Sequence, residues 1–118
     1  MSALQSPAYS DVITGYWHEI LEYGQPETIE RVMADLAGMD QAVMVNYFAA
    51  VLAYRPVPDL QQFNGPIHII HAPVTDVPNG LHQLFPNIPA TKIESASHWL
   101  QLDKPADFQA AFDQALSH

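Results

Sequence analysis

The sequence of 118 residues contains no cysteine. Disulfide bonds, thiolate catalysis and cysteine-based metal sites are therefore excluded. Basic residues are also scarce, because four Lys and Arg stand against 13 Asp and Glu, which gives a net charge of −9 at pH 7. The four are scattered and form no patch: Arg31, Arg55, Lys92 and Lys104. We therefore expect neither nucleic acid nor an anionic membrane surface as a partner.

Long hydrophobic runs are missing as well. No segment approaches the roughly 18 apolar residues that a membrane-spanning helix requires. The N-terminal stretch MSALQSPAYS has neither the basic segment nor the apolar segment of a signal peptide. A cytoplasmic protein that spans no membrane is thus the default expectation.

The chain is nevertheless apolar, since 48% of its residues are hydrophobic and only 14% are charged. Its length corresponds to a single domain, residues 1–118. A low charged fraction leaves more apolar surface than usual to be covered. Either a wide buried core or association with another chain would explain it, and composition does not separate the two.

The first half of the chain has helical periodicity in three stretches between residues 10 and 54, with apolar residues recurring at i, i+3, i+4 and i+7, and in the first and third stretches also at i+8. Residues 1–9 show no such pattern and are expected to form a loose arm. Capping signals place the helix starts at Ser10–Asp11, Pro26 and Asp40, and the ends at Gly24, Gly38 and Arg55–Pro58.

The second half of the chain has a different sequence pattern, with β-branched runs, prolines and turn residues. A β-branched run at 67–72, bounded by prolines, predicts a buried strand of the parallel type. A turn-rich loop, a short helix at 81–85 and a second strand near 91–94 follow. Pro105 then opens the last helix. The expected fold class is α/β, with three N-terminal helices followed by a βαβα unit (66–118) that holds a short parallel sheet.

Two segments of this second half, GPIHIIHAPVTDVP and SASHWLQLDKPADFQAAFDQAL, resemble the C-terminal part of α/β-hydrolase-fold proteins. The resemblance implies that Asp76 occupies the position of the catalytic acid and His98 that of the catalytic histidine. It also implies that residues 10–54 correspond to the family's helical lid. Ser97 departs from the pattern, because the family commonly has glycine there.

The catalytic nucleophile of that family has no counterpart in this sequence. There is no G-x-S-x-G elbow and no oxyanion-hole loop. The chain therefore resembles a truncated hydrolase, with Asp76 and His98 as a vestigial hydrogen-bonded pair. The alternative is a hydrolase of esters or related small molecules. In that case Asp76 and His98 would use a nucleophile from another chain or a water activated by His98.

Metal ligation and acid–base carboxylate pairs receive little support. His68 and His71 alternate across a strand and so point to opposite faces, and His82 adds no recognisable ligand spacing. Glu27/Glu30 and Asp103/Asp107 fit helix N-terminal acids better than a catalytic pair. We therefore expect no metal and no cofactor.

A binding or self-association role is the leading interpretation. In the resembling family the lid lines an apolar substrate pocket, which makes a small apolar ligand a further candidate partner here. A two-stranded sheet also leaves edges that need covering. A homodimer that joins sheets or packs lid helices would cover both the edges and the apolar surface. The pocket candidates are Trp17, Tyr47, His71 and Trp99.

Overall fold

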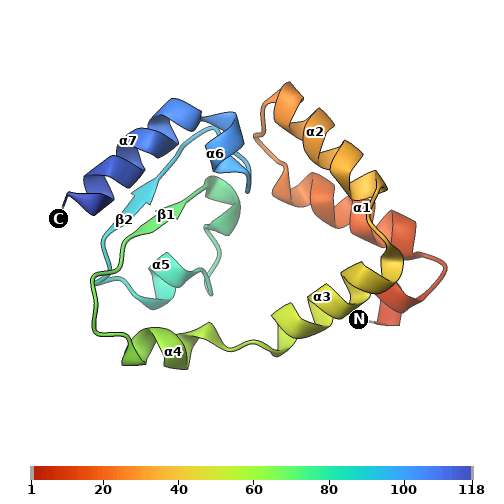
Figure 1. Ribbon diagram of the computed structural model, residues 1–118, viewed down its shortest axis with the longest axis horizontal. Helices are drawn as coiled ribbons and strands as arrows, with labels where there is room; N and C mark the ends of the chain where they lie inside the picture. Colours follow the sequence, from red (N-terminus) through yellow and green to blue (C-terminus); the bar gives the residue numbers. More distant parts are fainter. Residues whose placement is uncertain (1, 118) are drawn as a thin grey trace.

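The computed structural model describes residues 2–117 and shows a mostly helical chain with a small parallel sheet (Figure 1). The mixed α/β class is thus confirmed at this coarse level. The helices are α1 Tyr9–Ile20, α2 Pro26–Ala37, α3 Gln41–Ala53, α4 Pro56–Gln62, α5 Leu81–Leu84, α6 Leu100–Asp103 and α7 Pro105–Leu116, and the strands are β1 Ile69–His71 and β2 Ala90–Lys92.

Two of the three predicted starts of the N-terminal helices are confirmed. Pro26 is the first residue of α2, and the Asp40 side chain caps α3 by accepting hydrogen bonds from the backbone N–H groups of Ala42 and Val43. The predicted Ser10–Asp11 cap is wrong. Helix α1 begins at Tyr9 after Ala8, with no side-chain cap, because the preceding turn already directs the backbone into the helix.

Residues 2–8 form turns that pack against the helices, which corrects the expectation of a loose arm there, while Met1 lies outside the described residues. Residues Ser2–Gln5 form a 3₁₀ turn, η1. Leu4 is buried there in a cluster with Ile13, Leu36 and Met44. Burial of one leucine side chain contributes about 1.5–3 kcal/mol, enough to hold a short turn against the helices.

Proline both ends and begins helices near residue 55. Helix α3 ends at Ala53, as predicted, but Pro56 then opens α4, which the sequence did not predict. A proline at the first helical position lacks only an N–H that would have had no partner. The segment before the last helix contains the single turn of α6, which the sequence did not predict either.

The two strands are shorter than predicted, at three residues each, and pair in parallel with Ile69 opposite Ala90 and His71 opposite Lys92. The ladder extends one step past β2, where the N–H of Ile93 donates to the carbonyl of His71 at 2.8 Å. Helix α7 packs against this sheet through the half-buried Phe108 and the buried Ala111. Within residues 2–117 no third strand covers either outer edge.

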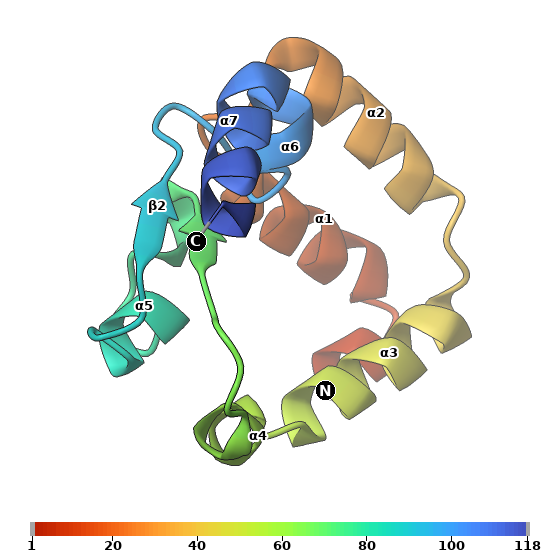
Figure 2. The same cartoon turned by 60° about the vertical axis from the view of Figure 1, so that its left-hand side comes forward.

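The helical half and the sheet-containing half have separate hydrophobic clusters. Helices α3 and α4 run along the lower edge of the molecule in both views, from the helical half to beneath the sheet-containing half (Figures 1 and 2). No single described helix is long and apolar enough to cross a membrane.

Candidate functional site

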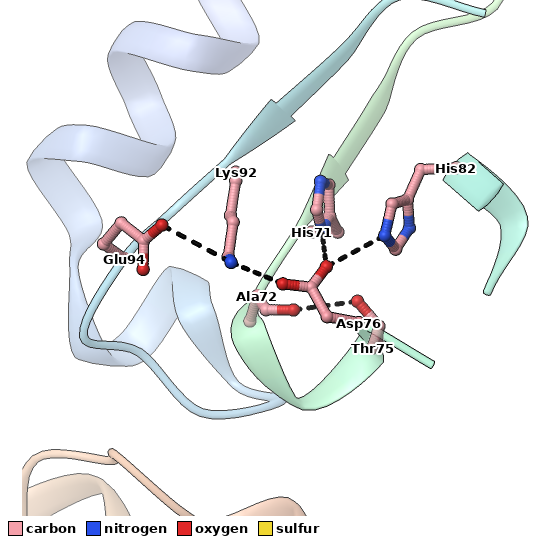
Figure 3. Close-up of polar contacts among 7 residues, drawn as sticks. All are labelled: His71, Ala72, Thr75, Asp76, His82, Lys92 and Glu94. Carbon is pink, nitrogen blue, oxygen red and sulfur yellow. Dashed lines mark hydrogen bonds and ion pairs between the residues drawn. The ribbon is translucent and has the colours of Figure 1, made fainter. Parts of the chain in front are cut away.

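Asp76 lies at the centre of a polar cluster at the carboxyl end of the sheet (Figure 3). Its Oδ1 is 2.9 Å from Nε2 of His82 and 3.6 Å from Nδ1 of His71. Its Oδ2 forms an ion pair with the ammonium group of Lys92, which also lies 3.5 Å from Glu94. The carboxylate therefore offers one oxygen to two imidazoles and the other to a cation.

The pairing of the strands brings these side chains together. His71 ends β1, Lys92 ends β2, and the two are register partners. Neighbouring residues on parallel strands project to the same face, so both side chains emerge beside the loop that carries Asp76. After β1 the chain turns through a 3₁₀ segment, η2 (Pro73–Thr75), and the Thr75 hydroxyl donates to the Ala72 carbonyl at 2.9 Å.

The loop then folds back so that His82 on α5 faces Asp76. Gly80 allows this closure, since a Cβ at that position would lie 2.5 Å from the carbonyl oxygen of Thr75. The imidazoles of His71 and His82 stack with their centroids 3.9 Å apart and their planes inclined by 16°. Both rings therefore approach the same oxygen of Asp76 from one side.

Charge and burial shift the pKa values of three residues of the cluster. The hydrogen bond from Lys92, more than any other influence, lowers the pKa of Asp76, and Asp76 in turn raises the pKa of Lys92. Burial lowers the pKa of His71, and the neighbouring His82 lowers it further. At neutral pH the cluster thus holds an ionised carboxylate, an ammonium and a neutral His71.

His71 has an unsatisfied polar atom. Its side chain is only 10% exposed, and its Nδ1 is buried without a hydrogen-bond partner. A buried nitrogen without a partner costs about 1–3 kcal/mol relative to one that is satisfied. A ligand that bound Nδ1 would remove this cost.

His98 lies on the loop between β2 and α6 with different neighbours. Its backbone N–H donates to the carbonyl of Ile20 at the end of α1, and its ring meets Trp99 edge-on with centroids 5.2 Å apart. The residue is exposed, but partial desolvation of the ring lowers its pKa. Within residues 2–117 the His98 side chain makes no hydrogen bond, and Asp76 binds His82 and Lys92 instead.

The predicted pocket residues do not form one site. Trp17 and Trp99 lie together, with ring centroids 6.2 Å apart. Tyr47 stands on the exposed side of α3, and His71 belongs to the Asp76 cluster. An apolar groove of about 970 Å³ lies instead between the amino ends of the strands and the end of α7, lined by Ile67, Ile70, Phe112 and Leu116 among others.

A second carboxylate, which sequence reasoning assigned to a helix N-terminus, joins the two halves of the molecule. Asp103 is 6% exposed. Its Oδ2 accepts hydrogen bonds from the backbone N–H and the hydroxyl of Ser97, at 2.7 and 2.6 Å, and its Oδ1 accepts the N–H of Gln25 at 2.7 Å. Asp103 thereby ties the start of α2 to the loop before α6.

His82 and Lys92 were missed as site residues. Their signals were indirect: a Pro78–Asn79–Gly80 turn between Asp76 and His82, and the position of Lys92 at a strand end. Only the strand register and the loop closure bring them to Asp76.

Comparisons with known proteins identify no relative of this chain, since no family model, no curated protein and no solved structure matches it. Its function is therefore inferred from its own residues.

Proposed function

We propose that the protein is a non-catalytic, self-associating protein that forms a homodimer through helix α3. The observation that carries this proposal is the composition of α3, QAVMVNYFAAVLA, which contains no charged residue and is apolar around most of its circumference, with Gln41 and Asn46 as its polar amide side chains. A helix of this kind is stable only when it is buried all round.

Most of α3 is exposed in the single chain. Met44 is its one buried residue, while Val45 and Phe48 are half-buried. Val43, Tyr47 and Val51 follow at i, i+4 and i+8, and they are 54%, 59% and 48% exposed. We call these three residues the α3 stripe. Its spacing is that of one helical face prepared to pack on another helix.

The surface area of the chain supports a second copy as the occupant. The chain has an accessible surface of 7929 Å², about 1,500 Å² more than a compact monomer of this mass exposes. A standard interface buries about 800 Å² on each partner. The excess is thus large enough for a stable dimer.

The charges at the ends of α3 support an antiparallel arrangement. Asp40 precedes the helix and Arg55 follows it, with no charge between them. In a two-fold symmetric antiparallel pair, each Asp40 lies near the partner's Arg55, and the helix dipoles oppose one another. A net charge of −9 opposes association over most of the surface, so a charge-free face is the favourable place for it.

Substitution of Tyr47 by glutamate tests the proposal, because a charge at the centre of the α3 stripe would have to be desolvated in the dimer. Sedimentation equilibrium should show the dissociation constant of Tyr47→Glu raised by at least about 100-fold over wild type. The matched control is Leu116→Glu, a substitution at the 69% exposed end of α7, which should leave the dissociation constant unchanged.

The control also separates the alternatives. Leu116 lines the groove beside the sheet. If Leu116→Glu dissociates the dimer and Tyr47→Glu does not, the interface lies at the sheet, and the proposed role of α3 is wrong.

A further inference from the structure

We propose that His71, Asp76 and His82 form a binding site for one divalent first-row transition-metal ion, of which zinc is the best match. Two imidazoles and one carboxylate are the ligands that such ions prefer. The site is independent of the α3 interface, because it lies at the opposite half of the molecule (Figures 1 and 3).

The spacing of the donor atoms suits one ion. Nδ1 of His71, Nε2 of His82 and a carboxylate oxygen of Asp76 all lie within 4.8 Å of one another. In a tetrahedral zinc site, bonds of about 2.0–2.1 Å place neighbouring ligand atoms about 3.3 Å apart. The two distances to Asp76 Oδ1, 2.9 and 3.6 Å, already bracket that value.

The unpartnered Nδ1 of His71 is a second, independent indication of a ligand. This nitrogen is buried, makes no hydrogen bond and faces Asp76 across a gap of 3.6 Å. A coordinated ion would satisfy it. Among the described residues, the nearest acceptor is Asp76 Oδ1 at 3.6 Å, which is too far for a hydrogen bond.

The surrounding residues could support the ion. Lys92 holds Asp76 through Oδ2, which leaves Oδ1 for the metal and fixes the orientation of the carboxylate, as outer-sphere partners do in metal sites. Three protein ligands leave a fourth position open for water or another molecule. The nearby Lys92 charge weakens the attraction for a cation, so we expect moderate affinity.

One local movement is required. A metal lies in the plane of each imidazole that binds it, whereas the planes of His71 and His82 are nearly parallel, at 16°. One ring must therefore rotate. His82 is the better candidate, because it lies on the four-residue helix α5, whereas His71 is fixed in the sheet.

The test is a titration of the untagged full chain with Zn²⁺ alone, monitored by isothermal titration calorimetry. We expect one ion per chain for wild type. His82→Ala and Asp76→Asn should each weaken binding by at least about 10-fold. The control variant His18→Ala removes an exposed histidine of α1 and should bind as wild type does.

Two further readouts keep the result decisive. Zn²⁺ should raise the melting temperature of wild type but not of His82→Ala, because only the folded site binds the ion. Co²⁺ should give the visible absorption of a four-coordinate site in wild type alone. Absence of Zn²⁺ binding to wild type at millimolar concentration, or unchanged binding in His82→Ala, would overturn the proposal.

Discussion

At the scale of single residues, the two carboxylates that matter most have different roles. Asp76 is exposed and surrounded by titratable groups, which makes it a candidate ligand. Asp103 is buried and accepts only from backbone N–H groups and hydroxyls. It is a structural residue that connects the helical half to the sheet-containing half. Both stand at the end of a short helical turn, Asp76 after η2 and Asp103 at the end of α6.

Substitution of Asp103 by asparagine should destabilise the fold. The amide cannot accept all three hydrogen bonds, which leaves buried N–H or O–H donors of Ser97 and Gln25 unsatisfied. We expect the free energy of unfolding to fall by about 2–4 kcal/mol, measured by urea denaturation at a fixed protein concentration. Asp107→Asn, at an exposed position of α7, should change it by less than about 0.5 kcal/mol. Equal stability of the two variants would contradict the structural role.

The same residue predicts a pH dependence. Burial by itself would raise the pKa of Asp103, but the hydrogen bonds from Ser97 and Gln25 outweigh it, so the pKa in the folded state is lowered. A lowered folded pKa means that the unfolded chain binds the proton first as the pH falls. The contribution of Asp103 should thus be complete above pH about 4 and be lost as the pH falls further. Asp103→Asn should show a shallower loss of stability over that range.

His98 provides a direct test of the hydrolase alternative. Because its side chain has no acid partner among the described residues, no group orients it as a general base. We expect the hydrolysis of a chromogenic ester to proceed at the same background rate with wild type and with His98→Ala. A wild-type rate at least about ten times that of the variant would favour the hydrolase instead.

At the scale of elements, sequence periodicity predicted the long helices and the parallel strands well, but not their environment. Helix α3 was correctly placed from Asp40 to the Arg55–Pro58 segment, since capping and breaking residues act locally. The exposure of α3 in the single chain was not predictable. Apolar residues at helical spacing indicate that a helix is buried, but they do not specify whether its own chain or another chain buries it. The sequence did not predict α4, because a proline such as Pro56 can end one helix and is also a favoured first residue of the next.

The candidate site was predictable only in part for a related reason. The sequence places Asp76 after a predicted strand, and the resemblance to a hydrolase pairs this residue with His98 rather than with His82 and Lys92. The contacts of Asp76 depend on the His71–Lys92 register and on closure of the loop at Gly80. Those are tertiary features, and a sequence pattern specifies them weakly.

The orientation of paired α3 helices can be tested with Arg55→Glu. In the antiparallel dimer this change places a carboxylate near the partner's Asp40. The attraction between residues 40 and 55 at each end of the helix pair thereby becomes a repulsion. The dissociation constant should rise roughly 5-fold or more, and added salt should reduce the difference. Arg31→Glu makes the same change in net charge on α2 and should have a much smaller effect. Equal effects of the two variants would argue against the antiparallel arrangement.

At the scale of the whole molecule, the single chain is too extended for its length. Its radius of gyration is 16.1 Å and its extents are 48 × 34 × 22 Å, whereas a compact domain of this length has a radius of about 13.5 Å. Helices α3 and α4 contribute to the extension, because they form an outer edge of the molecule (Figures 1 and 2). A second copy packed against the α3 stripe would restore an ordinary ratio of surface to volume.

The mass of the wild-type protein in solution tests this account most directly. Sedimentation equilibrium over a range of micromolar concentrations should give a species of about twice the chain mass of 13.1 kDa, in reversible exchange with monomer at the lowest concentrations. The mass should not depend on Zn²⁺, since the proposed metal site lies away from α3. A mass of 13.1 kDa at every concentration would contradict the proposed dimer.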